Sequence, residues 1–302
     1  MRPAAVEGTI ETHTRGSDTP DFESSPIPPS QARQAAAARR FALTKWYFDC
    51  VEEDGTAFIG YSARLVYRGT GVSYASVLLR DPNGRVQTRT SLRRTASPSA
   101  TGSTVSWNHG PLAVAGTWQA AALPVSRALL EYHGGAVSWN CAQPLSRARV
   151  QVGSHRPVSG WGYAELLEIT IPPWQLPFDH LRWGHFMADG GAMVWIQWQG
   201  EGDATWVFVD GAETAPATVD DGRVKGRGLD LRLDRCCVLR EGSVGSTALG
   251  RGTVLARLLP LSILRTFERK WLSRGFLQRG ASPPIAGWAI HEDVAFGKGS
   301  VP

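Results

Sequence analysis

Short segments of alternating polar and apolar residues, separated by glycine-containing turns, run through most of this sequence. Five turn signals stand between pairs of such segments: Asp54-Gly55, Asn83-Gly84, Gly134-Gly135, Asp210-Gly211 and Asp221-Gly222. Turns of this kind join antiparallel strands, because Gly, Asn and Asp tolerate the backbone angles that a tight hairpin requires. The side chains of a strand point alternately to its two faces, so the alternation indicates strands with one buried face. The sequence therefore predicts an all-β fold, an antiparallel sandwich or barrel.

The turn spacing divides the chain of 302 residues into a tail and two β-rich halves. Residues 1–40 are dominated by Ser, Thr, Pro, Gln and Ala, a composition typical of a disordered tail. We place an N-terminal domain at 41–155 and a C-terminal domain at 156–302. Expected strands cover 45–51, 57–67, 72–79, 87–91, 104–107, 116–122, 128–133, 136–139, 161–171, 180–187, 191–199, 204–209, 223–225, 228–234 and 287–296.

One segment near the C-terminus departs from the strand pattern. Between 254 and 279, apolar residues recur at helical spacing, with basic residues between them. This pattern predicts one amphipathic helix, which either contacts a membrane surface through residues 261–279 or docks on a barrel mouth or the domain seam. We favour docking.

The bulk composition excludes several classes of protein. The net charge is +5, but the arginines are scattered and form no stripe, so we expect no nucleic-acid partner. No run approaches the roughly 20 apolar residues that span a bilayer, and the N-terminus lacks the apolar core of a secretory signal, so we expect a cytoplasmic protein. Four cysteines fit buried, reduced thiols better than a disulfide framework. The sequence specifies no oligomeric state.

Cofactor and metal motifs are missing from the sequence. It contains no phosphate loop, dinucleotide fingerprint, nucleophile elbow or zinc-ligand spacing. His180 and His185 share no helix face and have no ligand-spaced partner nearby. We therefore expect neither a cofactor nor a metal.

The segment 161–171 carries one acid where an apolar residue is expected. As a strand it places Trp161, Tyr163, Glu165, Leu167, Ile169 and Ile171 on one face. An ionised carboxylate on such a face is costly unless it is paired or protonated. Glu165 is therefore a candidate catalytic acid, although a bulge or register slip would turn it outward.

Other candidates combine acids with aromatic and histidine residues. Asp49 lies in an aromatic strand, and Glu292 follows His291 on the closing strand. Two aromatic–histidine pairs are candidates for a pocket wall: Trp107 with His109, and Trp183 with His185. The sequence has 12 tryptophans, which either fill the core or line a cavity for a large apolar ligand. Each acid also has a structural alternative as a surface group or a partner of an arginine.

From Trp46-Tyr-Phe-Asp49 onward the sequence resembles the carotenoid 1,2-hydratase / AttH-like superfamily. The same group includes tocopherol cyclases and lipocalin-like Diels-Alderases. The resemblance continues through Tyr132-His-Gly-Gly, Trp139-Asn-Cys and Gly160-Trp-Gly-Tyr-Ala-Glu165 to Gly287-Trp-Ala-Ile-His-Glu292, and covers about residues 44–298. It implies two tandem lipocalin-like (calycin) antiparallel β-barrel domains with a cavity within or between them. It also implies action on apolar polyene, prenyl or polyketide skeletons without a redox cofactor.

The resemblance also implies roles for individual residues. Asp49 matches the acid of the Trp-Tyr-x-Asp pattern, and Glu165 stands where hydratase-type members have an Asp. Those members continue to an Asn and a Gly, whereas this sequence has Leu166 and Leu167, which argues against hydration of a carotenoid.

The leading hypothesis is an enzyme, and two alternatives stay open. We expect a cyclase, isomerase or hydratase-like enzyme with Glu165 as the acid and Tyr163 and His185 orienting it or the substrate. The expected cavity wall consists of Trp107, Trp161, Trp183 and Trp195, with His109 and Glu292 as further substrate contacts. The alternatives are a carrier of a hydrophobic small molecule, and a structural module whose barrels are filled by their own tryptophans.

Overall fold

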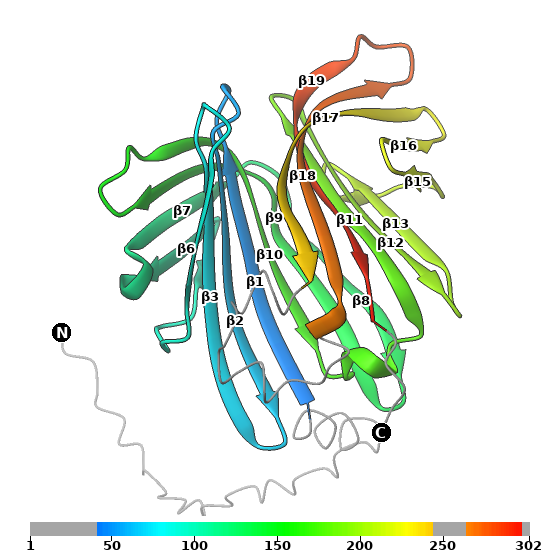
Figure 1. Cartoon of the computed structure of the whole chain (residues 1–302). Helices are drawn as coiled ribbons and strands as arrows, with labels where there is room; N and C mark the ends of the chain where they lie inside the picture. The colour runs from blue at the N-terminus through cyan, green and yellow to red at the C-terminus, as the bar shows by residue number, and fades with distance from the viewer. Residues whose placement is uncertain (1–40, 244–263, 298–302) are drawn as a thin grey trace, which may run out of the picture.

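Two large antiparallel sheets form the molecule, as the computed structural model of residues 41–243 and 264–297 shows. Figure 1 places the first sheet, coloured blue to green, beside the second, coloured green to red. The prediction of an all-β fold is confirmed. The expected tail at 1–40 lies outside the described residues.

The first sheet has ten strands in the order β4-β3-β2-β1-β10-β9-β7-β6-β5, with β8 also paired to β9. Strand β9 is long enough to pair with β8 through its first half and with β7 through its second half. The strands are β1 (Phe41–Val51), β2 (Ala57–Tyr67), β3 (Thr70–Arg80), β4 (Val86–Ser91), β5 (Ser99–Thr101), β6 (Thr104–His109), β7 (Val114–Ala120), β8 (Val125–Tyr132), β9 (Gly135–Val152) and β10 (Val158–Ile169). The short 3-10 helix η1 (Gly110–Leu112) connects β6 to β7.

The second sheet has nine strands in the order β14-β13-β12-β11-β19-β18-β17-β16-β15. The 3-10 helix η2 (Pro173–Gln175) precedes it. Its strands are β11 (Phe178–Ala188), β12 (Gly191–Gly200), β13 (Ala204–Val209), β14 (Ala212–Glu213), β15 (Thr218–Asp220), β16 (Arg223–Gly226), β17 (Leu229–Ser243), β18 (Phe267–Arg279) and β19 (Ile285–Ala295).

The predicted turns join these strands. Between β1 and β2, Gly55 has a φ of +84°, a conformation that glycine adopts without strain. The Asp54 side chain accepts a hydrogen bond from the backbone N–H of Thr56 (2.8 Å), which fixes the turn. The same pairing of a strand pattern with a glycine turn recurs in the second sheet at Gly190 and Gly211.

The expected amphipathic helix is wrong for residues 267–279; Leu264 and Arg265 are helical, and residues 254–263 of the expected segment lie outside the described part. Residues 267–279 form β18, which pairs with β17 on one side and β19 on the other. Both faces of this central strand are covered at residues 270–273, so the consecutive residues Trp271, Leu272 and Ser273 are all buried, and a fully buried run of this kind does not show the strand period. Membrane contact through residues 261–279, of which 261–263 lie outside the described part, stays a prediction. No helix among the described residues has the length and apolarity needed to cross a bilayer.

The sheets divide the chain later than the expected boundary between 155 and 156. Strand β10 pairs with β1 and β9 and so belongs to the first sheet. The second sheet begins with β11 at Phe178. The division into two independently folding domains stays a prediction.

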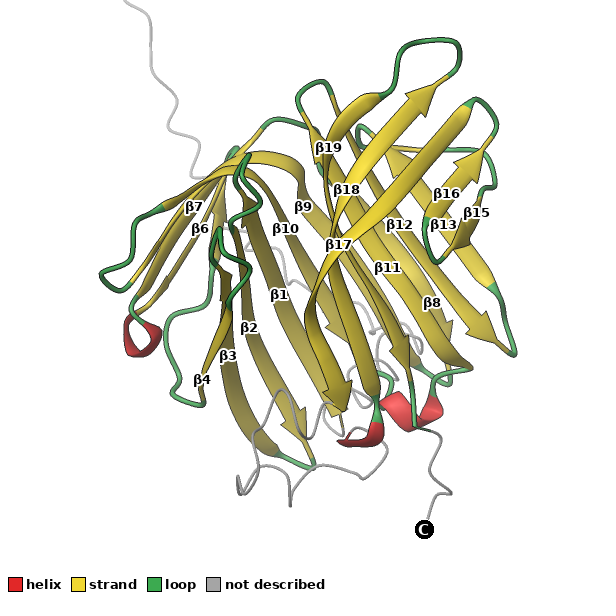
Figure 2. Ribbon diagram, turned by 45° about the horizontal axis from the view of Figure 1, so that its top comes forward, coloured by secondary structure: helices red, strands yellow, loops and turns green. Residues whose placement is uncertain are grey.

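The buried side chains form one core inside each sheet, a shared core between the sheets, and a smaller cluster of Val137, Ile171, Leu176, Phe178 and Trp198. The core inside the first sheet includes Phe48, Trp107 and Trp118, and that inside the second includes Phe186 and Trp195. The shared core combines Tyr47, Trp139 and Tyr163 from the first sheet with Trp183, Phe208 and Leu272 from the second. Figure 2 shows β1, β2 and β10 opposite β11, β17 and β18 across this layer. Because side chains alternate along β1, Tyr47 packs in the shared core and its neighbour Phe48 packs in the core inside the first sheet.

Candidate active site

A cavity of about 330 Å³ lies at the layer between the two sheets. Most of its wall is apolar and comes from both sheets, and a further part comes from the segment that links them. The apolar lining residues are Leu43, Leu129, Val137, Trp139, Leu167, Ile169, Pro173, Leu176, Phe178, Leu181, Trp183, Ile196, Trp198, Val294 and Phe296. The polar lining residues are Lys45, Tyr61, Glu165, Thr266, Glu268 and Glu292. Such a wall suits an apolar molecule that carries a few polar groups.

Glu165 is buried in the cavity wall, as the alternation of β10 predicts. Its side chain is on the same face as Tyr163, and the residue is only 5% exposed. The register between β10 and β9 shifts by one residue on each side of Ala164, whose partner on β9 is Gln143; the next residue, Pro144, lacks the N–H that a regular ladder requires. The irregularity does not turn Glu165 outward.

Two glycines allow β10 to approach its neighbours closely at this point. A Cβ atom at Gly160 would lie 2.0 Å from the carbonyl oxygen of Val51, and one at Gly162 would lie 2.5 Å from the Cβ of Ala148. Only glycine fits at such distances. These two positions therefore set the path of the strand that presents Tyr163 and Glu165.

Two neutral donors hold the Glu165 carboxyl group. The indole Nε1 of Trp139 donates to Oε2 at 2.5 Å, and the hydroxyl of Tyr163 donates to the same oxygen at 2.7 Å. Burial raises the pKa of Glu165, and this effect outweighs the Lys45 charge and the two hydrogen bonds, which act in the opposite direction. Glu165 thus has the surroundings of a carboxyl group that stays protonated above its usual range.

Behind Glu165, a chain of contacts crosses from one sheet to the other. The Tyr163 ring stacks on the His185 ring, with centroids 4.2 Å apart and planes 6° from parallel. Nε2 of His185 lies 2.6 Å from Oδ2 of Asp49, and neither side chain is exposed. Asp49 and Tyr163 belong to the first sheet and His185 to the second. This chain fixes the position of the hydroxyl that holds Glu165.

A second acidic group of the cavity is paired with a buried cation. Nζ of Lys270 donates to Oε2 of Glu292 and lies 3.8 Å from Oε1 of Glu268. The ammonium group also lies above the Tyr47 and Trp183 rings, 5.3 and 5.2 Å from their centroids. Burial alone would raise the pKa of Glu292, but the charges of Lys270, Lys45 and Arg240 and the hydrogen bond from Lys270 together outweigh it and hold this pKa below its usual value.

The structure brings six of the ten predicted site residues to this region. Glu165, Trp183 and Glu292 line the cavity. Tyr163, His185 and Asp49 lie directly behind Glu165.

The other four residues lie elsewhere, which corrects their placement in the cavity wall. Trp107 stacks on Phe48 inside the first sheet (5.3 Å), and Trp195 belongs to the core of the second sheet. Trp161 packs beneath the guanidinium group of Arg147, which lies 3.4 Å from its ring centroid. His109 lines a different pocket, on the far face of β1 to β3. Alternation gives the face of each strand but does not say which core that face meets.

Sequence reasoning missed several cavity residues. Lys45 shares its strand face with Asp49, so the alternation of β1 already contained this signal. Trp139 belongs to one of the segments that resemble the family, but its hydrogen bond to Glu165 becomes evident only from the pairing of β9 with β10. Among the described residues, no three His, Cys, Asp or Glu side chains lie close enough together to hold a metal ion.

Comparison with known proteins shows a clear likeness in structure. The crystal structure of CghA matches with a TM-score of 0.56 and 12% identity over 86% of this chain and 90% of that chain. Kievitone hydratase from Nectria haematococca matches with a TM-score of 0.52 and 8% identity over 91% and 94%. The candidate AttH protein NE1406 of Nitrosomonas europaea matches with a TM-score of 0.51 and 11% identity over 90% and 98%.

Sequence comparisons add nothing to this likeness. No protein-family model matches the sequence, and a search of curated proteins finds no match. At the low identities of the structural matches, the likeness establishes the fold. The chain therefore has the two-sheet, lipocalin-like fold of these proteins, as its sequence resemblance implied.

Proposed function

We propose that the protein is an enzyme without a redox cofactor that cyclises, isomerises or hydrates a hydrophobic biosynthetic intermediate, such as a polyketide, polyene or prenyl compound. The observation that carries the proposal is the buried Glu165 carboxyl group in the wall of a largely apolar cavity. A carboxyl group in such surroundings suits general-acid catalysis near neutral pH, because burial favours its protonated form.

The size and chemistry of the cavity support this substrate class. Its volume of about 330 Å³ is at the lower end of the range for ligand pockets, about 300–1,000 Å³. The wall offers aromatic and aliphatic side chains along most of its length, and charged groups come from few positions. An apolar molecule with a few polar groups matches this lining.

The geometry at Glu165 suggests how a proton is delivered. Trp139 and Tyr163 both donate to Oε2, which leaves Oε1 as the oxygen that carries the proton. This proton passes to a carbon or oxygen atom of the substrate, and the electron pair of the O–H bond stays on the carboxylate. The two donors and the nearby Lys45 charge then stabilise the carboxylate that has formed.

Other groups of the cavity wall stabilise the positive charge that develops on the substrate. Glu292 is held ionised by Lys270, so it can attract a developing cation or accept a proton from the carbon next to it. The aromatic faces of Trp139, Tyr61 and Trp183 add electrostatic stabilisation. In hydration, a water molecule would instead attack the cation and lose its proton to Glu292.

The names of two structural neighbours support the proposed function, an enzyme that acts on a small molecule. One of the matching crystal structures is CghA with Sch210972, in which that protein is seen with a small molecule. Another neighbour is, by its name, a hydratase.

A carrier of a hydrophobic small molecule remains the second candidate, because the same apolar wall suits storage. The decisive experiment begins with mass spectrometry of molecules retained by the protein from its native host, compared with extracts of a deletion strain. The accumulating compound is then incubated with wild type, with Glu165→Gln and with Glu168→Gln. Glu168 lies on the same strand and is exposed, so it is a matched control.

The enzyme proposal predicts conversion by wild type and Glu168→Gln and almost none by Glu165→Gln. Tight binding of the compound without conversion by any of the three proteins would favour the carrier. Unchanged conversion by Glu165→Gln would show that the cavity acts only as a template.

A further inference from the structure

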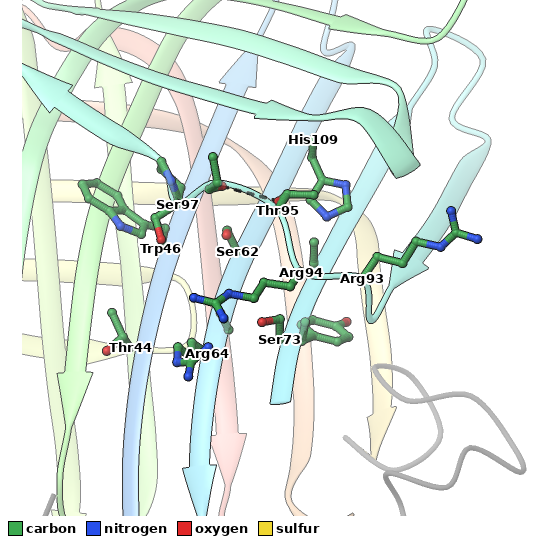
Figure 3. Close-up of a pocket in the computed structure, with 15 residues that line it drawn as sticks. Thr44, Trp46, Ser62, Arg64, Ser73, Arg93, Arg94, Thr95, Ser97 and His109 are labelled. Atoms are coloured by element: carbon green, nitrogen blue, oxygen red, sulfur yellow. Dashed lines mark hydrogen bonds between the residues drawn. The ribbon is translucent and has the colours of Figure 1, made fainter. Parts of the chain in front are cut away.

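Lys45 is a charged residue of the cavity wall without a carboxylate partner. It lies on β1, is partly buried and lines the cavity between the two sheets. Its neighbours Thr44 and Trp46 point to the opposite face of β1, where they line a different pocket (Figure 3). The Lys45 ammonium group lies 5.6 Å from the centroid of the Tyr61 ring. Among the described residues, no carboxylate lies within ion-pair distance of this group.

The pairing of β1 explains why Lys45 has no carboxylate beside it. The residues directly opposite Lys45 are Ala63 on β2 and Leu167 on β10. Glu165 occupies a diagonal position, because it pairs with Tyr47, the next residue on the same face of β1. Diagonal positions in an antiparallel pair are about 7–8 Å apart. The Lys45 charge therefore acts on Glu165 across a gap, and it lowers the pKa of this acid without forming an ion pair.

Two further cations lie close to the cavity, and each contacts a carboxylate. Lys270 contacts both Glu292 and Glu268, and the guanidinium group of Arg240 lies 3.8 Å from a carboxylate oxygen of Glu268. These two cations and two carboxylates balance one another. In the described part of the chain, the charge of Lys45 is therefore left on the cavity wall without a counterion.

An unpaired charge in a largely apolar cavity is costly, and a ligand of opposite charge reduces that cost. Glu165 cannot act as the counterion while burial keeps it protonated. We propose that the cavity binds an apolar molecule with one carboxylate group, and that the ammonium group of Lys45 binds this carboxylate in the gap beside Glu165. One unpaired charge matches a carboxylate better than a phosphate monoester, which carries about −1.5 to −2. The inference rests on the proposed function, because it names the class of substrate for the same cavity.

A carboxylate at Lys45 fixes the orientation of the substrate. The apolar part of the molecule then lies along the aliphatic and aromatic wall, and the atoms next to the carboxylate lie closest to Glu165. A negative charge beside Glu165 disfavours its ionisation, so the bound substrate itself keeps the proton on the acid before transfer.

Isothermal titration calorimetry of the whole protein at neutral pH, with decanoate, 1-decanol and decylammonium, tests the proposal. Decanoate should bind about tenfold or more tightly than decanol, because it gains a charge-assisted hydrogen bond, and decylammonium should bind most weakly. Lys45→Met should remove the preference for decanoate and keep the binding of decanol, which shows that the variant is folded. Lys225→Met, exposed on β16, is the matched control and should keep the preference.

Nuclear magnetic resonance of decanoate labelled with carbon-13 in its carboxyl group identifies the partner of that group. At saturation, the pKa of the bound carboxyl group should be higher in Lys45→Met than in wild type, because an adjacent ammonium group favours the ionised form. An equal pKa in the two proteins would overturn the proposal. So would equal binding of decanoate and decanol, tightest binding of decylammonium, or an unchanged preference in Lys45→Met.

These measurements do not depend on turnover, so the two proposals can fail separately. Glu165→Gln should keep the preference for decanoate, because it removes the acidic proton and leaves Lys45 in place. If decanoate is preferred but Glu165→Gln converts the identified substrate like wild type, the acid mechanism fails and the carboxylate site stands. If conversion requires Glu165 but decanoate binds no better than decanol, the carboxylate site fails and the acid mechanism stands.

Discussion

Glu165 and Glu292 line the same cavity, yet their surroundings favour opposite protonation states. Glu165 lies on β10 and accepts hydrogen bonds from the neutral groups of Trp139 and Tyr163. Glu292 lies on β19 and contacts the buried ammonium group of Lys270. Burial raises the pKa of Glu165, whereas Lys270, with the nearby charges of Lys45 and Arg240, outweighs burial and lowers the pKa of Glu292.

The comparison shows that partners decide the role of a buried acid more than burial itself. Neutral donors reduce the cost of burying a carboxyl group without forcing its ionisation, and an adjacent ammonium group forces it. A pair of acids separated in this way can serve as proton donor and proton acceptor in one reaction. The predictions below test this difference, beginning with the largest expected effect.

Glu165→Gln should have the largest effect on activity. Because glutamine keeps the shape but has no acidic proton, turnover of the identified substrate should fall by about 100- to 10,000-fold, the usual contribution of a general acid. Glu168→Gln should leave turnover within about twofold of wild type, as a typical exposed substitution does. Steady-state kinetics checks both. A similar loss in both variants would mean that the acid is not specific to the cavity.

Lys270→Met should have the largest effect on folding. It leaves Glu292 buried without its cation, which typically costs about 3–5 kcal/mol in the free energy of unfolding. Arg127→Gln breaks the exposed pair with Glu213 and should cost about 0–1 kcal/mol. Denaturant unfolding of the two variants measures the difference. If Lys270→Met costs no more than Arg127→Gln, Glu292 does not depend on its cation in the way described.

Tyr163→Phe should weaken catalysis by a smaller factor. It removes one of the two donors to Oε2, which stabilise the carboxylate after proton transfer, so kcat should fall by about 10- to 100-fold. The ring still stacks on His185, so the fold should be kept. Tyr132→Phe, on the partly exposed β8, is the control and should change kcat little. An unchanged kcat in Tyr163→Phe would remove Tyr163 from the mechanism.

Lys45→Met should shift the pH dependence by a small amount. A general acid must be protonated, so turnover should fall as the pH rises through the raised pKa of Glu165. The Lys45 charge lowers that pKa, and its removal should therefore move the fall to higher pH. Lys225→Met, on the exposed part of β16, should leave the profile where it is. A shift to lower pH would contradict the arrangement of charges at Glu165.

The fold could be predicted from sequence wherever a strand has one buried face and one solvent-exposed face. Residues 229–234 alternate cleanly, and β17 starts where the pattern predicts. Strand β18 could not be recognised in this way, because both of its faces are buried at residues 270–273, between the flanking strands β17 and β19. Lys270 was missed for the same reason, because only the pairing of distant strands shows that this lysine is internal.

The sequence could predict only those parts of the candidate site that lie on a single strand. The alternation of β10 indicated that Tyr163 and Glu165 share an inward face, and both are buried there. Alternation within one strand could not separate Trp183, which lines the cavity, from Trp107, which packs inside the first sheet. That distinction depends on which strands the two sheets bring together.

Infrared spectroscopy of the folded protein at neutral pH tests the central claim most directly, because protonated and ionised carboxyl groups absorb at different frequencies. Difference spectra would compare wild type with Glu165→Gln and with Glu292→Gln. The account predicts that Glu165→Gln removes a band of a protonated carboxyl group, and that Glu292→Gln removes only carboxylate absorption. A spectrum in which Glu165 contributes as a carboxylate, or Glu292 as a protonated acid, would contradict it.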